Sequence, residues 1–104
     1  MTGENISKRP DRAPTHPGAV LREDVLPALG IKIMTAAKDL GVSRQTLHRI
    51  LAESAPITPA MAVRLGKFCG NGPELWLSMQ GRFDLWQAKK LLRSEIDRIP
   101  SRAA

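Results

Sequence analysis

The residues needed for metal binding and disulfide chemistry are almost absent from this chain. Cys69 is the only cysteine, so an intrachain disulfide is excluded, and with just two histidines the chain lacks a zinc site of the usual spacing. No stretch approaches the ~18 apolar residues of a membrane span, and the first residues lack the apolar core of a signal peptide. We therefore expect a soluble, cytoplasmic protein with no metal, no cofactor and no membrane contact.

Catalytic patterns are missing as well. No Ser/His/Asp set can be proposed from spacing, and the carboxylates are too scattered to suggest an acid–base pair. The segment Gly70-Asn71-Gly72 is too short for a phosphate-binding glycine loop and runs directly into Pro73. We predict no catalytic residue, and a chain this short has little room for a substrate pocket. The sequence therefore does not indicate an enzyme.

Positive charge is what the chain has in excess. Its 104 residues suit one domain, and 42% apolar with 25% charged residues is close to the average of globular proteins. Sixteen basic residues outnumber ten acidic ones, which leaves a net charge of +6. This positive charge is suited to binding a nucleic acid, an acidic partner or an anionic membrane surface. The alternative is that the charge only maintains solubility.

The hydrophobic pattern is helical, with no alternating run long enough for a strand. We predict a flexible tail over residues 1–15, one domain over 16–99, and a frayed end over 100–104. The first helix begins at Pro17, because a proline in the first turn loses no hydrogen bond, and it ends near Pro27.

Cap residues divide the middle of the chain. A connector, Leu29-Gly30-Ile31, leads into a second helix over about 33–40 that ends before Gly41. Ser43 is a suitable N-cap for a third helix over about 44–52. The apolar residues of the second helix recur at helical spacing and are Ile33, Ala36, Ala37 and Leu40.

Two proline starts define the last two helices. Thr58 followed by Pro59 begins a fourth helix that ends at Gly70. The fifth runs from Pro73 to about Arg93, and Gly81 within it permits a bend. His16 is assigned to the start of the first helix and Cys69 to packing, whereas Trp76, Phe83 and Trp86 are assigned to the core, to an interface or to both.

Two short helices joined by a glycine turn, over residues 33–50, predict a helix-turn-helix. Ala37 is small enough for a close helix crossing, and Gly41 tolerates the positive φ of the turn. Apolar side chains stand where the two helices would meet, at Ala36, Leu40, Val42, Leu47 and Ile50. A generic helical hairpin is the alternative.

The third helix has one polar and one apolar face, because successive residues are about 100° apart. The polar members are Arg44, Gln45, His48 and Arg49, and the apolar members are Leu47, Ile50 and Leu51. Arginine pairs with guanine and glutamine with adenine in the major groove, so Arg44, Gln45 and Arg49 are candidate base contacts. Ser43 and Thr46, with the free N–H groups of the helix start, are candidate phosphate contacts. For His48, contact with a base, contact with a phosphate and exposure to solvent are all left open. For the polar face as a whole, the alternative is that it is only solvated.

The fifth helix is longer than one small core requires. Its apolar residues spread over more than one face and are Trp76, Leu77, Phe83, Leu85, Trp86, Leu91 and Leu92. A single recognition helix reads too few base pairs for a unique site, whereas a two-fold dimer reads two half-sites about 34 Å apart. We predict a homodimer joined toward Leu91, Leu92 and Ile96. The alternative is a helix that folds back over the core of the monomer.

Three blocks of this sequence resemble the HigA-type antitoxins of the Xre-like helix-turn-helix superfamily, also called the VapI-type group. The first block is His16-Pro17-Gly18, the second runs from Leu40 to Leu47, and the third runs from Ile57 to Ala88. The resemblance extends over about Thr15 to Lys90, or roughly three quarters of the chain. The second block is common to many repressors, whereas the third is much more specific.

This resemblance implies an all-α, lambda-repressor-like DNA-binding domain of five helices with a long C-terminal helix. It implies a dimer that binds double-stranded operator DNA as an inverted repeat and represses its own promoter. It also implies a partner toxin, HigB, a RelE-like ribonuclease that cleaves mRNA. A stand-alone repressor without a toxin and a protein-interaction adaptor without DNA binding are the alternatives.

The chain departs from the family pattern in two segments. Members often have a capping Ser and a phosphate-binding Gln where this chain has Lys32 and Ile33, so Lys32 is our substitute phosphate contact. Members also often have Asn-Gly and basic residues after the recognition helix, where this chain has Ala52-Glu53-Ser54-Ala55. This chain thus lacks, in that loop, the residues with which family members contact phosphate.

Overall fold

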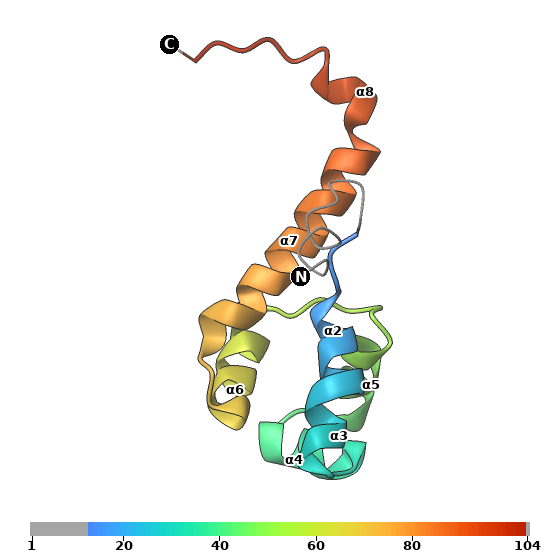
Figure 1. Cartoon of the computed structure of the whole chain (residues 1–104), viewed down its shortest axis with the longest axis vertical. Coiled ribbons are helices and arrows are strands. Elements are labelled where there is room, and N and C mark those ends of the chain that lie inside the picture. The colour runs from blue at the N-terminus through green and yellow to red at the C-terminus, as the bar shows by residue number, and fades with distance from the viewer. Residues whose placement is uncertain (1–12, 104) are drawn as a thin grey trace, which may run out of the picture.

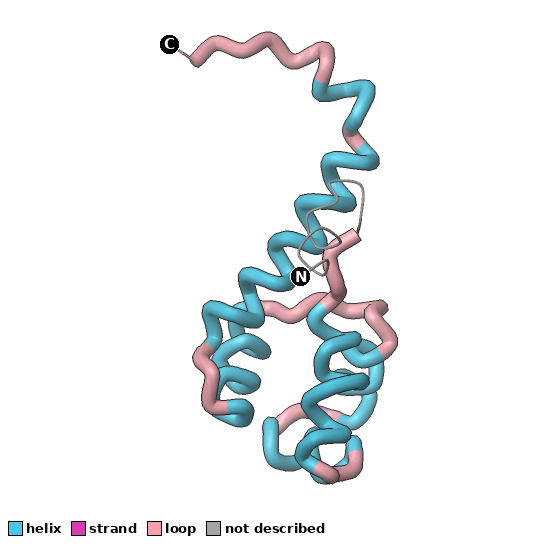
Figure 2. The backbone as a smooth tube through the Cα atoms, viewed as in Figure 1, coloured by secondary structure: helices cyan, strands magenta, loops and turns pink. Residues whose placement is uncertain are grey.

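The computed structural model describes residues 13–103, and every regular element in that range is a helix (Figure 1, Figure 2). The all-α class is confirmed. Most of the tail predicted over 1–15, and the last residue of the end predicted over 100–104, lie outside the described residues. Residues 13–15 and 100–103 have no regular structure.

The first helix consists of three consecutive segments, α2 (Pro17–Val20), η1 (Leu21–Val25) and α3 (Leu26–Leu29). The Leu26 N–H donates to the Leu21 carbonyl five residues back, which makes η1 a π-helical turn. This wider turn lets the helix pass through Pro27, whose ring would clash with a carbonyl of a regular helix. The predicted end near Pro27 is therefore wrong. The helix ends at Leu29, and Gly30 follows with a φ of 67°.

The remaining helices follow their cap residues. The second and third helices are α4 (Ile33–Leu40) and α5 (Arg44–Leu51), and Gly41 between them has a φ of 73°. The fourth, α6 (Pro59–Cys69), begins after Thr58, whose hydroxyl accepts from the Met61 N–H. The fifth, α7 (Pro73–Leu91), runs through the Gly81 position without interruption, and a short α8 (Arg93–Ile96) follows it.

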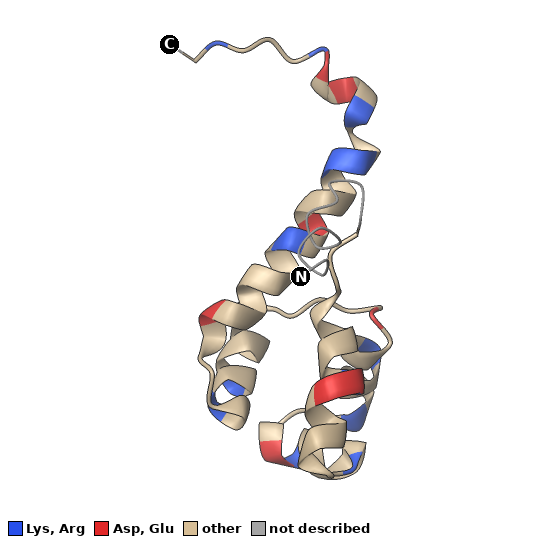
Figure 3. Ribbon diagram, viewed as in Figure 1, with Lys and Arg blue, Asp and Glu red and all other residues tan. Residues whose placement is uncertain are grey.

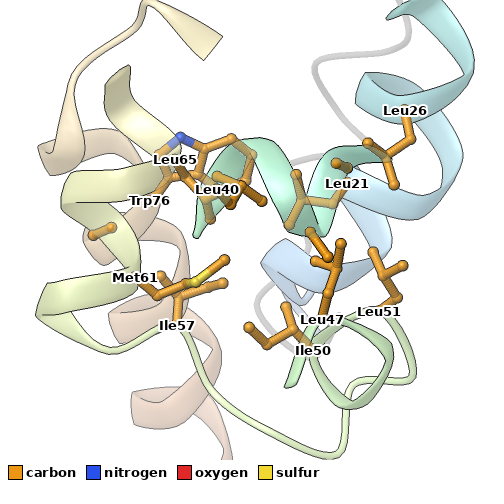
Figure 4. Packing of buried hydrophobic residues seen from close by; sticks show 13 residues of the cluster. Leu21, Leu26, Leu40, Leu47, Ile50, Leu51, Ile57, Met61, Leu65 and Trp76 are labelled. Carbon is orange, nitrogen blue, oxygen red and sulfur yellow. The ribbon is translucent and has the colours of Figure 1, made fainter. Parts of the chain in front are cut away.

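One hydrophobic core joins these helices (Figure 4). Its large side chains come from η1, α3, α4, α5, α6 and α7, and they include Leu21, Leu26, Leu40, Leu47, Ile50, Leu51, Met61, Leu65 and Trp76. Trp76 is 1% exposed, and its indole N–H donates to the Asn71 Oδ1 atom at 3.1 Å. Trp76 is therefore a core residue, whereas Phe83 and Trp86 are only half-buried.

The first helix meets α5 through a backbone contact at Gly18. A Cβ atom at Gly18 would lie 1.9 Å from the Ile50 carbonyl oxygen, so only glycine permits this approach. The preceding His16 caps α2, because its Nδ1 atom accepts from the Gly18 N–H at 2.9 Å. The His16 ring also packs edge-on against Phe83 of α7, with ring centroids 4.9 Å apart. The His16-Pro17-Gly18 block thus joins three helices, and His16 lies at the helix start as predicted.

A buried amide holds the loop between α5 and α6. The Gln80 Oε1 atom accepts from the Ile57 N–H at 2.8 Å, and its Nε2 atom donates to the Asp84 carboxylate at 2.9 Å. Gln80 is 5% exposed, so these bonds replace the hydration that the amide loses on burial. The bond from Ile57 ties the loop before α6 to the middle of α7, and the bond to Asp84 lies within α7 and holds the Gln80 amide in place.

Substitution of Gly18 by alanine is expected to destabilise the fold by more than about 2 kcal/mol, because the new Cβ atom would force α2 away from α5. The matched control is Gly81→Ala, since nothing lies within 4 Å of a Cβ atom at that helical position. The control should gain about 0.5–1 kcal/mol. Urea unfolding measures both. Equal stabilities for the two variants would contradict the close approach.

Stability should also fall in mild acid because of His16. Burial lowers the pKa of His16 below its ordinary value of 6.5, although Glu53 and Asp84 act in the opposite direction and Arg22 acts with it. The unfolded chain then takes up the proton first, so the contribution is complete above pH 6.5 and is lost as the pH falls toward the folded-state pKa, at up to about 1.4 kcal/mol per pH unit.

The variant His16→Asn keeps an oxygen acceptor for the Gly18 N–H but cannot take up this proton. Urea unfolding of both proteins between pH 7.5 and 5 should therefore show a flatter pH dependence for the variant. The second histidine, His48, is exposed and common to both proteins, so the difference between them isolates His16. Parallel pH curves would rule out a buried neutral His16.

Candidate nucleic-acid interface

The helix-turn-helix presents the outer face of α5 to solvent. Arg44, Gln45, His48 and Arg49 are all exposed, and Leu47, Ile50 and Leu51 are all buried. The structure therefore places these four predicted polar residues together on one open face of a helix whose back is anchored in the core. Arginine and glutamine on such a face can donate to and accept from base edges in a major groove.

The start of α5 carries a pair of linked hydroxyl groups. The Ser43 Oγ atom accepts from the Thr46 N–H at 3.0 Å and donates to the Thr46 Oγ1 atom at 2.8 Å. The Ser43 proton is thus used inside the protein, whereas the Thr46 proton is left to donate outward. Of the two predicted phosphate contacts, Thr46 is the one with a side-chain donor to offer.

Lys32 occupies the N-cap position of α4 in extended backbone, and its side chain makes no capping bond. It is exposed, so its ammonium group is accessible to a ligand. The neighbouring Ile33 side chain is half-buried and packs against the core. Lys32 therefore supplies an accessible cation at the start of α4.

Arg64 of α6 holds the turn of the helix-turn-helix, and sequence reasoning missed it. Its Nη1 atom donates to the Leu40 carbonyl at 2.8 Å and to the Gly41 carbonyl at 3.4 Å. These carbonyls at the end of α4 lack partners within the helix. Because 24 residues separate Arg64 from Leu40, no local pattern signals the contact.

Arg22 has the matching role at the end of α5. Its guanidinium donates to the Leu51 carbonyl at 2.6 Å and to the Glu53 carboxylate at 3.2 Å. Glu53 has a φ of 62°, a conformation that favours glycine or asparagine. The loop after α5 thus contains a carboxylate paired with Arg22 and no cation of its own, which agrees with the departure seen in the sequence.

The second half of α7 and all of α8 extend away from the core (Figure 1). Large apolar side chains remain exposed there, at Leu85 (56%), Leu91 (79%), Leu92 (45%), Ile96 (51%) and Ile99 (65%). Basic residues recur along the same segment (Figure 3), and the Lys90 ammonium lies 5.1 Å from the centre of the Trp86 ring. Phe83 at the start of this projecting segment packs against His16, and beyond it the large apolar side chains named above stay exposed within residues 13–103.

Other kinds of site find no support in residues 13–103. No group of three or more His, Cys, Asp or Glu residues lies close enough together to hold a metal ion there. No helix in that range is long and apolar enough to cross a membrane. Cys69 is half-buried against the core, and burial raises the pKa of its thiol, which suits the packing role predicted for it.

Comparison with known proteins gives clear relatives, although no family model matches the sequence. A helix-turn-helix transcriptional regulator of Haemophilus influenzae is 44% identical over 75 residues, which are 72% of this chain and 70% of that protein. The antitoxin HigA-1 of Vibrio cholerae is 30% identical over 88 residues, 85% of this chain and 83% of that protein. The antitoxin GraA, solved in complex with its operator, is similar with a TM-score of 0.81 and 34% identity, over 89% of this chain and 94% of that one.

Proposed function

The chain belongs to the family of HigA-type antitoxins and helix-turn-helix transcriptional regulators, and on this premise we propose that it is a DNA-binding antitoxin that represses its own promoter. The observation that carries the proposal is the exposed polar face of α5. The likeness to GraA in complex with its operator supports it, because that similarity covers nearly the whole chain. The family consists of non-enzymatic regulators. A cytoplasmic location is part of the proposal, because a repressor of its own promoter has to reach the chromosome.

Arg44 and Gln45 are proposed to read bases. Both stand in the first turn of α5, the part of a recognition helix that enters the major groove most deeply. Arg49 stands one turn further on and contacts a base or a phosphate. Lys32, Ser43, Thr46 and His48 are proposed contacts to phosphate or to the edge of the groove. Since each neutralised phosphate releases counterions, affinity should fall linearly with salt on a log–log plot.

We propose that the domain over residues 16–99 forms a two-fold homodimer through the end of α7 and α8. Exposed apolar side chains concentrate in that segment, and a second copy of the chain would remove them from water. A two-fold dimer would also present two α5 helices to the two halves of an inverted repeat. The limits of this domain, residues 16 and 99, are set by the tails predicted over residues 1–15 and 100–104.

A HigB-type, RelE-like toxin is the proposed protein partner, on the strength of the antitoxin relatives. The alternative is a stand-alone repressor of the same fold. Co-purification of this chain with the product of the neighbouring gene separates the two. An adaptor without DNA binding is disfavoured, because it would have no use for the exposed Arg44 and Gln45 pair.

Replacing Arg44 or Gln45 by alanine should weaken binding to the operator by about 1–3 kcal/mol each while leaving the fold intact, because both side chains are exposed. The operator probe is a duplex from directly upstream of the gene, and gel-shift titration measures the affinity. Arg82→Ala on α7 removes the same charge as Arg44→Ala at an exposed position away from α5 and is the control. Unchanged affinity for both α5 variants would exclude this face as the reader.

Truncation after Ala88 should convert the dimer into a monomer, because it removes Leu91, Leu92 and Ile96. The core helices remain, so circular dichroism should still show a folded helical protein. Light scattering at tens of micromolar compares the two chains. A monomeric full-length protein would refute the dimer. A dimeric truncated chain would place its interface elsewhere.

A further inference from the structure

A groove of about 300 Å³ lies between the second half of α5 and the start of α6. Its charged lining residues are two arginines, Arg49 and Arg64, and its hydroxyl groups come from Thr46 and Thr58. The rest of the lining is apolar and consists of Val42, Ile50, Ala55, Pro56, Ala60 and Met61. Within the part of the chain that the structure describes, no carboxylate lines this groove, so its charge selects an anion.

The polar groups of this groove have hydrogen-bond donors to spare. The Thr46 oxygen accepts from Ser43 and the Thr58 oxygen accepts from the Met61 N–H, so each hydroxyl proton is left to donate. Arg64 uses its Nη1 atom on the two carbonyls of the α4–α5 turn, and the other N–H groups of its guanidinium are not bonded within residues 13–103. The Arg49 guanidinium forms no hydrogen bond or ion pair in that range, whereas the backbone carbonyl of Arg49 accepts from Ser54.

The groove is also continuous with the proposed reading face, because Thr46 and Arg49 belong to α5 and line the groove. We propose that it binds the sugar–phosphate backbone of one DNA strand beside the major groove. One phosphate accepts from Arg49, Arg64 and the threonine hydroxyls, and the deoxyribose carbons pack on the apolar floor. This inference rests on the proposed function and assigns Arg49 to phosphate.

The groove explains how the chain manages without a basic loop after α5. In that loop the charged side chain is Glu53, which pairs with Arg22. The cations that a backbone phosphate needs stand instead on two helices, Arg49 on α5 and Arg64 on α6. The Arg64 guanidinium thus has two roles. It donates to the carbonyls at the end of α4, and it donates to the phosphate of the DNA strand.

A charge reversal inside the groove tests the proposal. Ala60 lines the groove, is exposed, and occupies the first turn of α6, where an acidic residue favours the helix. Ala60→Glu should therefore fold normally and repel the phosphate, whereas Ala60→Lys should attract it. Gln87→Glu, at an exposed position on α7, is the control for added negative charge because charges beyond about 8 Å are screened at physiological salt.

Affinity is measured as a function of salt on two duplexes, one from directly upstream of the gene and one of scrambled sequence. Ala60→Glu should weaken binding about tenfold on both duplexes and reduce the magnitude of the salt slope by about 1, as expected for one lost phosphate. Ala60→Lys should strengthen binding to both and steepen the slope. Gln45→Ala should affect only the upstream duplex.

Each other outcome has a definite meaning. If Ala60→Glu matches Gln87→Glu, or if it weakens only the upstream duplex, the groove does not hold the backbone and the inference is wrong. If Ala60→Glu leaves DNA binding unchanged but abolishes binding of a polyglutamate peptide, the groove binds an acidic protein segment instead. A wild-type chain that does not distinguish the two duplexes would refute the proposed function itself.

Discussion

The backbone contact between Gly18 and Ile50 sets the position of the helix that carries the proposed reading face. With eight residues, α5 is too short to be stable alone, so its direction depends on what it packs against. The missing side chain at Gly18 lets α2 approach the carbonyl of Ile50 directly. Arg22 and Arg64 then bind carbonyls at the ends of α5 and α4. The orientation of the α5 reading face is thus set by three contacts, and each of them involves backbone atoms.

Local signals in the sequence were sufficient to locate the helices. Ser43, Gly41 and Thr58 each satisfy an end of a helix by a short-range bond or a left-handed φ, so their residue types alone indicate the boundary. Helical periodicity likewise separated the exposed face of α5 from its buried face. The end of the first helix is predicted too early. A π-helical turn before Pro27 lets the helix continue through the proline, and the residue pattern gives no sign of this turn.

Long-range contacts could not be inferred in the same way. Arg22, Arg64 and Gln80 bond to groups 29, 24 and 23 residues away, and nothing in their own neighbourhood distinguishes them from solvated side chains. The groove beside α5 was also out of reach, because it exists only once α6 is placed against α5. The roles of the individual site residues therefore remain predictions even though their exposure agrees with them.

The longest helix gives the molecule a fixed length scale. With 19 residues, α7 is about 28 Å long, and its fully buried residues, Trp76 and Gln80, lie in its first half. In a dimer joined at the end of α7 and at α8, the turns of α7 after Gln80 set the distance between the two reading faces. One added helical turn would shift each face by about 5.4 Å, more than the ~3.4 Å rise of one base pair. Half-site spacing would then be encoded in the number of residues after Gln80, none of which needs to touch DNA.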